Sequence, residues 1–158
     1  MTGLVKINQY RKNLEKFFEK EVKVPETVLR PAKVADEYSR FDWYLYYGNL
    51  FGLVTDEEFS KASLQLLGLL MGTDKTSIKF DELSEASIPY TDAKEIDEYL
   101  KGLIVSIAQK HLNKHRYLGL RYLLLFCVTV ELITAEEFVE GHLALSRYEC
   151  KDIDGKRI

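Results

Sequence analysis

The sequence LVTDEEF at residues 53–59 returns almost unchanged as LITAEEF at residues 132–138, and this recurrence is the most informative feature of the chain. The two stretches keep one offset throughout, since 132 − 53 and 138 − 59 both give 79. Leucines follow each stretch at matched positions, 64 and 66 in the first and 143 and 145 in the second. The recurrence predicts two copies of one helical unit.

Each copy of the stretch has the pattern of a helix N-terminus. A threonine followed three residues later by a glutamate is a capping box, in which each side chain bonds to the other residue's backbone N–H. An apolar residue before the threonine and a phenylalanine after the glutamate form a hydrophobic staple. The cap pairs are Thr55 with Glu58 and Thr134 with Glu137, and the staples are Val54 with Phe59 and Ile133 with Phe138. The repeat therefore predicts a sharp corner between two helices in each unit.

A chemical role for the paired glutamates is the alternative, either as catalytic carboxylates or as calcium ligands. An EF-hand needs a loop of alternating aspartates with a glycine, and no such loop precedes residues 57–58 or 136–137. The cap accounts for every residue of the stretch, so we expect a structural role. The stretch also resembles short helical hairpins found at the ends of many bacterial proteins, which implies a helical corner and no activity.

The composition is that of a soluble globular protein of ordinary domain size. The chain has 158 residues, 46% of them hydrophobic and 30% charged, with a net charge of −3. This mild charge makes nucleic acid an unlikely partner. Cys127 lies in an apolar run and Cys150 in a polar tail, a usage that favours a reducing cytoplasm over a disulfide framework. The N-terminus lacks the apolar core of a signal peptide, and we expect no membrane association.

Apolar periodicity predicts six helices and hence an all-α fold. The segment 73–90 stays open between strand, helix and loop, with residues 77–80 as the candidate strand, and the charged tail 149–158 is expected to be frayed. The predicted helices cover residues 4–22, 32–53, 55–72, 91 or 92–111, 114–132 and 134–148.

The two halves align beyond the corner, since aromatic and leucine positions of 38–47 match those of 117–126. We expect one domain, 1–158, in which a first three-helix unit (about 4–72) and a second (about 92–148) are joined by 73–91. The run 118–133 is apolar on almost every side, which predicts burial because it is short for a membrane span and contains Arg121. The prediction is a compact six-helix array, either a pseudo-twofold bundle or a short solenoid-like stack, and two units favour the bundle.

A metal site is conceivable at His111 and His115, which stand four residues apart. The intervening residues lack the glutamate of a zinc protease, and His142 or a carboxylate would have to supply a third ligand. Lys114 and Arg116 would repel a cation. We therefore expect no metal and no cofactor, and a metal-dependent enzyme is only the third alternative.

Charges are unevenly distributed between residues 81 and 121. Acidic residues dominate up to position 98, and the loop acids Asp81, Glu82 and Glu85 are not explained by the dipole of the helix that follows. Such a loop suits a basic protein partner. Basic residues then follow without acids: Lys101, Lys110, Lys114, Arg116 and Arg121. They support an alternative, a nucleic-acid-associated or regulatory protein, although no phosphate loop or stacking platform accompanies them.

Aromatic residues are densest at 41–51, more than one helical face can bury. Tyrosine and tryptophan are enriched at binding hot spots, so we select Trp43, Tyr44, Tyr46 and Tyr47 as candidate partner-binding residues. No serine-hydrolase elbow, P-loop, dinucleotide fingerprint or Cys-x-x-Cys pair occurs. We expect a non-enzymatic protein-binding module, a stoichiometric inhibitor or immunity-type protein that uses these aromatic residues and the acidic loop against a basic toxin or nuclease.

Overall fold

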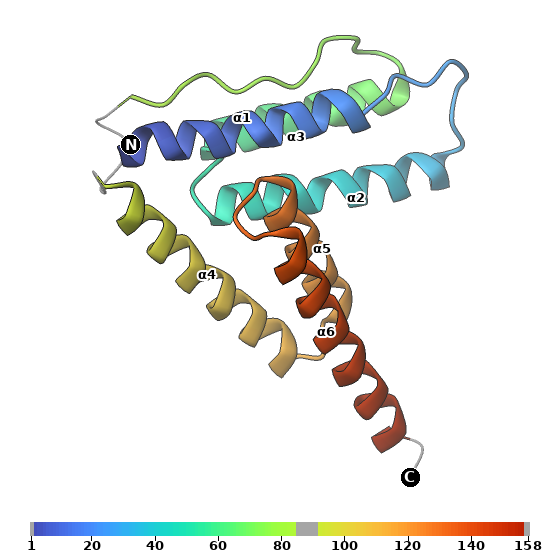
Figure 1. Ribbon diagram of the computed structural model, residues 1–158. Helices are drawn as coiled ribbons and strands as arrows, with labels where there is room; N and C mark the ends of the chain where they lie inside the picture. The colour runs from blue at the N-terminus through green and yellow to red at the C-terminus, as the bar shows by residue number, and fades with distance from the viewer. Residues whose placement is uncertain (1, 85–91, 157–158) are drawn as a thin grey trace. The chain divides into compact units, whose positions relative to one another are not determined.

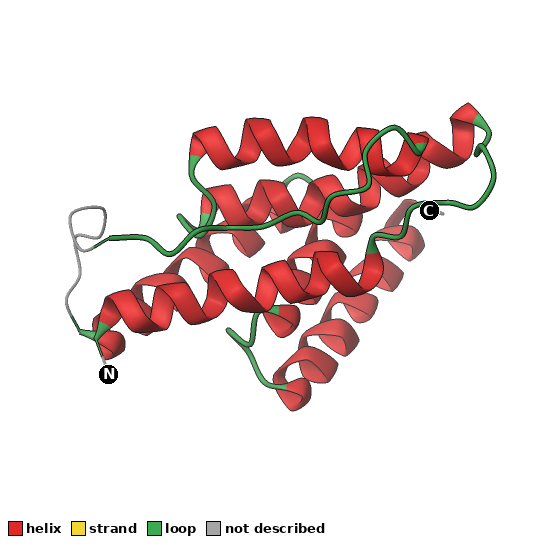
Figure 2. Ribbon diagram, turned by 90° about the horizontal axis from the view of Figure 1, so that it is seen from above, coloured by secondary structure: helices red, strands yellow, loops and turns green. Residues whose placement is uncertain are grey.

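The computed structural model describes residues 2–84 and 92–156, with side chains described up to residue 153. Within these residues the chain forms six helices and no strand (Figures 1 and 2). The all-α class is therefore confirmed. The helices are α1 (Gly3–Glu21), α2 (Pro31–Leu50), α3 (Asp56–Met71), α4 (Ala93–Asn113), α5 (Tyr117–Thr129) and α6 (Ala135–Lys156).

The chain divides into two compact units, Met1–Asp97 and Glu98–Ile158, and the boundary falls within α4. The first unit holds α1, α2 and α3 together with the connection that follows them. The second holds most of α4, from Glu98 onward, and the hairpin of α5 and α6. A search of the described helices for one long and apolar enough to cross a bilayer finds none.

The first unit is built around large apolar side chains that its three helices bury. Leu14 and Phe18 on α1 are four residues apart and therefore lie on one face, and both are almost completely buried. Leu45 of α2 and Leu66 of α3 are buried as well. Each such side chain contributes about 1.5–3 kcal/mol to folding, so the apolar stripes alone account for the helix packing.

The corner between α2 and α3 is closed by two hydrogen bonds to one backbone carbonyl. The Gly48 carbonyl accepts hydrogen bonds from the N–H groups of Leu53 (2.8 Å) and Val54 (3.0 Å), which close the turn. The Thr55 hydroxyl then accepts from the Glu58 N–H (3.1 Å), and the Glu58 carboxylate accepts from the Thr55 N–H (3.0 Å). The reciprocal pair is a complete capping box, which satisfies two backbone donors of the new helix.

The corner between α5 and α6 contains the same bonds. The Cys127 carbonyl accepts from the N–H groups of Leu132 (2.8 Å) and Ile133 (3.3 Å). Thr134 and Glu137 exchange side-chain and backbone hydrogen bonds of 3.1 Å each. Every residue in these bonds lies 79 positions after its counterpart in the first corner.

The two corners also share an unusual backbone conformation. Gly52 has φ 75° and Glu131, 79 positions later, has φ 69°. Both values lie in the left-handed region that favours glycine, so the second corner holds a non-glycine residue in a conformation that costs about 1–2 kcal/mol. A further glycine, Gly72, ends α3 in this conformation as its C-cap.

Two local predictions need correction, and one open question is answered. The tail is not frayed up to residue 156, because α6 continues to Lys156 and its last turns are tied down by an ion pair between Glu149 and Arg121. The helix predicted from residue 114 begins at Tyr117, so His115 lies in the turn between α4 and α5. Residues 77–80, for which strand, helix and loop stayed open, form neither a strand nor a helix. Residues 85–91 of the open segment lie outside the described part of the chain.

Candidate protein-binding surface

The acidic loop is held against α1 by hydrogen bonds from side chains to backbone. We call residues 78–84 the strap; Figure 1 draws it on the side of α1 and α3 that faces away from α2. The Phe80 N–H donates to the Glu15 carboxylate (2.8 Å), and Arg11 donates to the Asp81 carbonyl. Asn8 donates to the Leu83 carbonyl (3.3 Å) and accepts from the Leu83 N–H (2.9 Å).

The three α1 side chains that hold the strap share one helical face. Asn8, Arg11 and Glu15 are spaced by three and four residues, which places them one above another along α1. Phe17 lies on the opposite face and contacts the ring of Tyr44 on α2, with ring centroids 4.2 Å apart. The strap and α2 therefore occupy different sides of α1.

Arg11 joins the strap to the first corner. Its side chain is only 2% exposed and forms a two-pronged ion pair with Glu58, at 2.6 and 2.7 Å. It also donates to the Leu53 carbonyl (2.6 Å) and stacks over the Phe80 ring, 5.6 Å from the centroid. One guanidinium thus ties α1 to the corner residues and, through the Asp81 carbonyl, to the strap.

Glu58 both caps α3 and pairs with Arg11, and these contacts determine the pKa of its carboxyl. Burial raises the pKa of its carboxyl, but hydrogen bonds from Arg11 and Thr55 together with the Arg11 charge outweigh burial, so the pKa is lowered overall. Its counterpart Glu137 is exposed, and hydrogen bonds from Thr134, with a smaller effect from Lys101, lower its pKa. No cation of the second unit contacts Glu137 as Arg11 contacts Glu58, within the residues described.

The strap leaves its carboxylates in solvent. Asp81 and Glu82 are exposed, and neither forms an ion pair with any residue in the described ranges. The side chains between α1 and the strap line a hollow of about 130 Å³. Glu15 is one of its acidic walls, and Lys12 also lies at its edge. Glu85, the third predicted acid, lies outside the described residues.

The four predicted aromatic residues do not form one surface. Tyr44 and Tyr47 are buried, at 4% and 0% exposed, so neither ring is open to a partner. Trp43 is half-buried and stacks on Tyr47 with centroids 5.6 Å apart. Only Tyr46 is exposed, at 43%, and the strap lies on a different side of α1. The expected joint surface of aromatic patch and acidic loop is therefore divided.

The two histidines proposed as metal ligands, His111 and His115, lie in different environments. His111 is buried, and its ring lies where a Cβ on Gly119 would fall, 2.7 Å from the His111 Cε1. Burial first, and then the charges of Arg116 and Lys114, lower the pKa of His111. His115 is exposed in the turn after α4, with φ 55°, and its Nδ1 lies 3.4 Å from a carboxylate oxygen of Asp152.

The remaining site candidates have ordinary structural settings. Burial raises the pKa of Cys127 to about 12, so its thiol stays protonated, whereas Cys150 is exposed. Of the basic residues from the sequence, Arg121 is paired with Glu149, whereas Lys110 is exposed. Searching the described residues for three or more side chains placed to ligate a metal gives no group.

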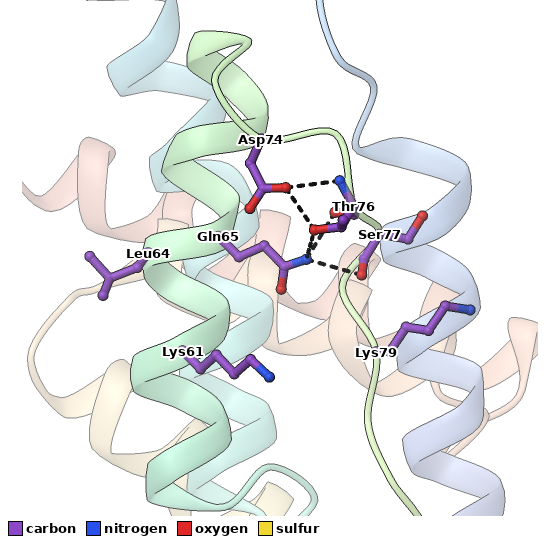
Figure 3. A pocket seen from close by; sticks show the side chains of 7 residues that line it. All are labelled: Lys61, Leu64, Gln65, Asp74, Thr76, Ser77 and Lys79. Carbon is purple, nitrogen blue, oxygen red and sulfur yellow. Dashed lines mark hydrogen bonds between the residues drawn. The ribbon is translucent and has the colours of Figure 1, made fainter.

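A broad open depression of about 530 Å³ lies between α3 and residues 74–79 (Figure 3). Gln65 donates to the Thr76 and Ser77 carbonyls at 2.8 and 3.0 Å, and Asp74 accepts from Thr76. These bonds hold the loop in place. Lys61 and Lys79 stand on its two walls, but Figure 3 shows Lys79 directed away from Lys61. The cations do not converge, so the depression is not a built anion site.

An apolar groove of about 570 Å³, which was not predicted from the sequence, lies between the start of α2 and the end of α3. Val28 is 93% exposed there, and Met71 is 54% exposed. The signal was present, because apolar residues at 28 and 29 precede Pro31 and another follows at 34. The lining is Val28, Leu29, Pro31, Val34, Ala35, Tyr38, Leu67 and Met71.

Comparisons of the chain with protein-family models, characterised proteins and solved structures found no match. The function therefore has to be argued from the strap and its surroundings.

Proposed function

We propose that the chain is a non-enzymatic protein-binding module that neutralises a basic protein, such as a toxin or a nuclease, by stoichiometric binding in the cytoplasm. The observation that carries the proposal is the fixed strap. Its backbone is bound to α1 through Asn8, Arg11 and Glu15, while the carboxylates of Asp81 and Glu82 remain exposed and unpaired within the described chain.

Such a fixed acidic segment suits recognition of a cationic surface. A preorganised loop loses little conformational entropy when it binds, so more of the interaction energy remains as affinity. Adjacent carboxylates also attract a basic partner over distance and increase the association rate. The hollow between Glu15 and the strap leaves room in which a lysine or arginine of the partner can approach the carboxylates of Asp81 and Glu82.

The proposal assigns a lesser role to the aromatic residues. Tyr46 offers a second contact on α2, separate from the strap, and Trp43 is partly accessible beside it. Tyr44 and Tyr47 support this surface from the interior.

We also propose that the fold arose by duplication of a three-helix unit, with a pseudo-twofold relation between the halves. Support comes from the corners, where Gly48 and Cys127 accept matched hydrogen bonds and Gly52 and Glu131 share positive φ. Among the described residues an arginine, Arg11, binds the capping glutamate of the first copy alone, and this difference supports divergence after duplication.

Affinity capture of the full chain from its native cell, followed by calorimetry with the purified partner, tests the function. Asp81→Lys/Glu82→Lys should weaken binding at least tenfold and reduce its salt dependence. The matched control is Glu19→Lys/Asp36→Lys, which makes the same change in net charge at exposed carboxylates of α1 and α2. Equal affinities for the two double variants, or turnover of a captured molecule, would overturn the proposal.

A further inference from the structure

The outer face of α6 carries an apolar stripe that no part of its own unit covers. Val139, Leu143 and Ile153 are 53%, 52% and 51% exposed, and Cys150 is exposed between the last two. The inner face is different, since Leu145 is 4% exposed and Glu149 is paired with Arg121. α6 is therefore apolar on two faces, only one of which is packed.

The spacing of the stripe is that of a coiled-coil seam. Val139, Leu143, Ser146, Cys150 and Ile153 follow one another at intervals of 4, 3, 4 and 3 residues. This alternation is the heptad pattern, with residues 139, 146 and 153 at d positions and 143 and 150 at a positions. The stripe therefore runs along one face of α6 in the arrangement against which a second helix can pack.

The charges beside the seam favour an antiparallel partner of the same sequence. Glu140 and Arg147 occupy e positions, both are exposed, and neither forms an ion pair with the described residues. In an antiparallel pair that places Leu143 opposite Ser146 of the second copy, each Glu140 meets an Arg147 of the second copy. Symmetry produces this attractive pair twice.

A parallel pair would not bring these opposite charges together. In that arrangement g positions face e positions five residues later, so Arg147 would face His142 and Glu140 would face Ala135 of the second copy. Neither contact is a pair of opposite charges. Charge complementarity thus selects one orientation of one occupant.

We infer that α6 forms an antiparallel homodimer interface along Val139, Leu143, Ser146, Cys150 and Ile153. The seam is only two heptads long, so it buries less surface area than a standard protein interface. The dimer is accordingly weak, with a dissociation constant in the micromolar range. This interface lies on the second unit and is independent of the proposed role of the strap.

Disulfide crosslinking of the full chain tests the orientation. The inferred register places Val139 opposite Cys150 of the second copy, whereas the two Cys150 thiols are separated by 11 residues, or about 16 Å along the helix axis. Val139→Cys should therefore form a covalent dimer rapidly under mild oxidation, and wild type should not. Ala144→Cys, an exposed position outside the seam, is the matched control and should crosslink no faster than wild type.

Charge exchange in sedimentation experiments tests the recognition. Glu140→Arg and Arg147→Glu should each weaken dimerisation about tenfold, and the double variant should restore it, because the exchanged pairs are regenerated across the twofold axis. Leu143→Asp should abolish the dimer. Circular dichroism of each variant checks that α6 remains helical.

Three results would overturn the inference. A wild-type chain that stays monomeric at millimolar concentration has no such interface. Preferential crosslinking of Cys150 to Cys150 would show a parallel pair. Protection of Val139→Cys from a thiol reagent in a monomer would show that another part of the same chain covers the stripe.

Discussion

The interaction between Arg11 and Glu58 gives the sharpest prediction about stability. Arg11 is nearly fully buried and makes two bonds to Glu58, one to the Leu53 carbonyl and one to the Asp81 carbonyl. Removing one member of a buried ion pair costs about 3–5 kcal/mol. The Glu58 side chain is 21% exposed, so partial rehydration places the expected cost of Arg11→Met near the lower end, about 3 kcal/mol.

A double-mutant cycle separates the pair from its surroundings. Glu58→Gln keeps the cap acceptor and removes the charge, and should cost about 2 kcal/mol because it leaves Arg11 buried with a weaker partner. The double variant Arg11→Met/Glu58→Gln should lose about 3 kcal/mol, which gives a coupling energy of about 2 kcal/mol (3 + 2 − 3).

Urea unfolding followed by tryptophan fluorescence measures these losses, since Trp43 is the single tryptophan and lies in the first unit. Glu137→Gln is the matched control, and circular dichroism follows its unfolding because this capping box lies in the second unit. It makes the same change at a box where no described arginine contacts the glutamate, and it should cost much less than Glu58→Gln. A coupling energy near zero, or equal losses for the two glutamine variants, would refute the reasoning.

Three further predictions concern single residues. Glu131→Gly should raise the free energy of unfolding by about 0.5 kcal/mol, because relief of the left-handed backbone strain exceeds the entropy cost of glycine. Gly52→Ala should lower the free energy of unfolding by about 1 kcal/mol. A loss of stability in both variants would contradict the strain argument. Burial, and then two nearby cations, lower the pKa of His111. As the pH falls below about 6.5, the unfolded chain therefore binds a proton at His111 before the folded chain does, and the free energy of unfolding decreases. His111→Gln should flatten this part of a stability-versus-pH curve measured by urea unfolding, and an unchanged slope would contradict the prediction. A thiol reagent at pH 8 should label Cys150 quickly and Cys127 only on unfolding, as mass spectrometry of the labelled chain can show; fast labelling of both would contradict the burial of Cys127.

The helices and corners were accessible from the sequence because they depend on local patterns. A threonine and a glutamate three residues apart define a cap within one turn, and stripes such as Leu14 with Phe18 reveal a buried face. The extension of α6 was missed because Glu149 reads as part of a charged tail until Arg121, 28 residues earlier, is known to lie beside it.

The candidate site was less accessible, because its contacts connect residues far apart in the chain. In the sequence Arg11 is one more cation on the polar side of an amphipathic helix. Its partners lie 42, 47 and 70 residues away, and no periodicity indicates such distances. Composition likewise could not distinguish exposed Tyr46 from buried Tyr44, since tyrosine is common in both settings.

The most direct test of the central claim is carboxyl footprinting of the full chain, with and without its captured partner. Carbodiimide coupling to an amine labels exposed carboxylates, and mass spectrometry reports the labelling of each. We predict that the partner protects Asp81 and Glu82 from labelling while Glu19 and Asp36 react as before. Unchanged labelling of Asp81 and Glu82, with protection at carboxylates elsewhere, would contradict the account.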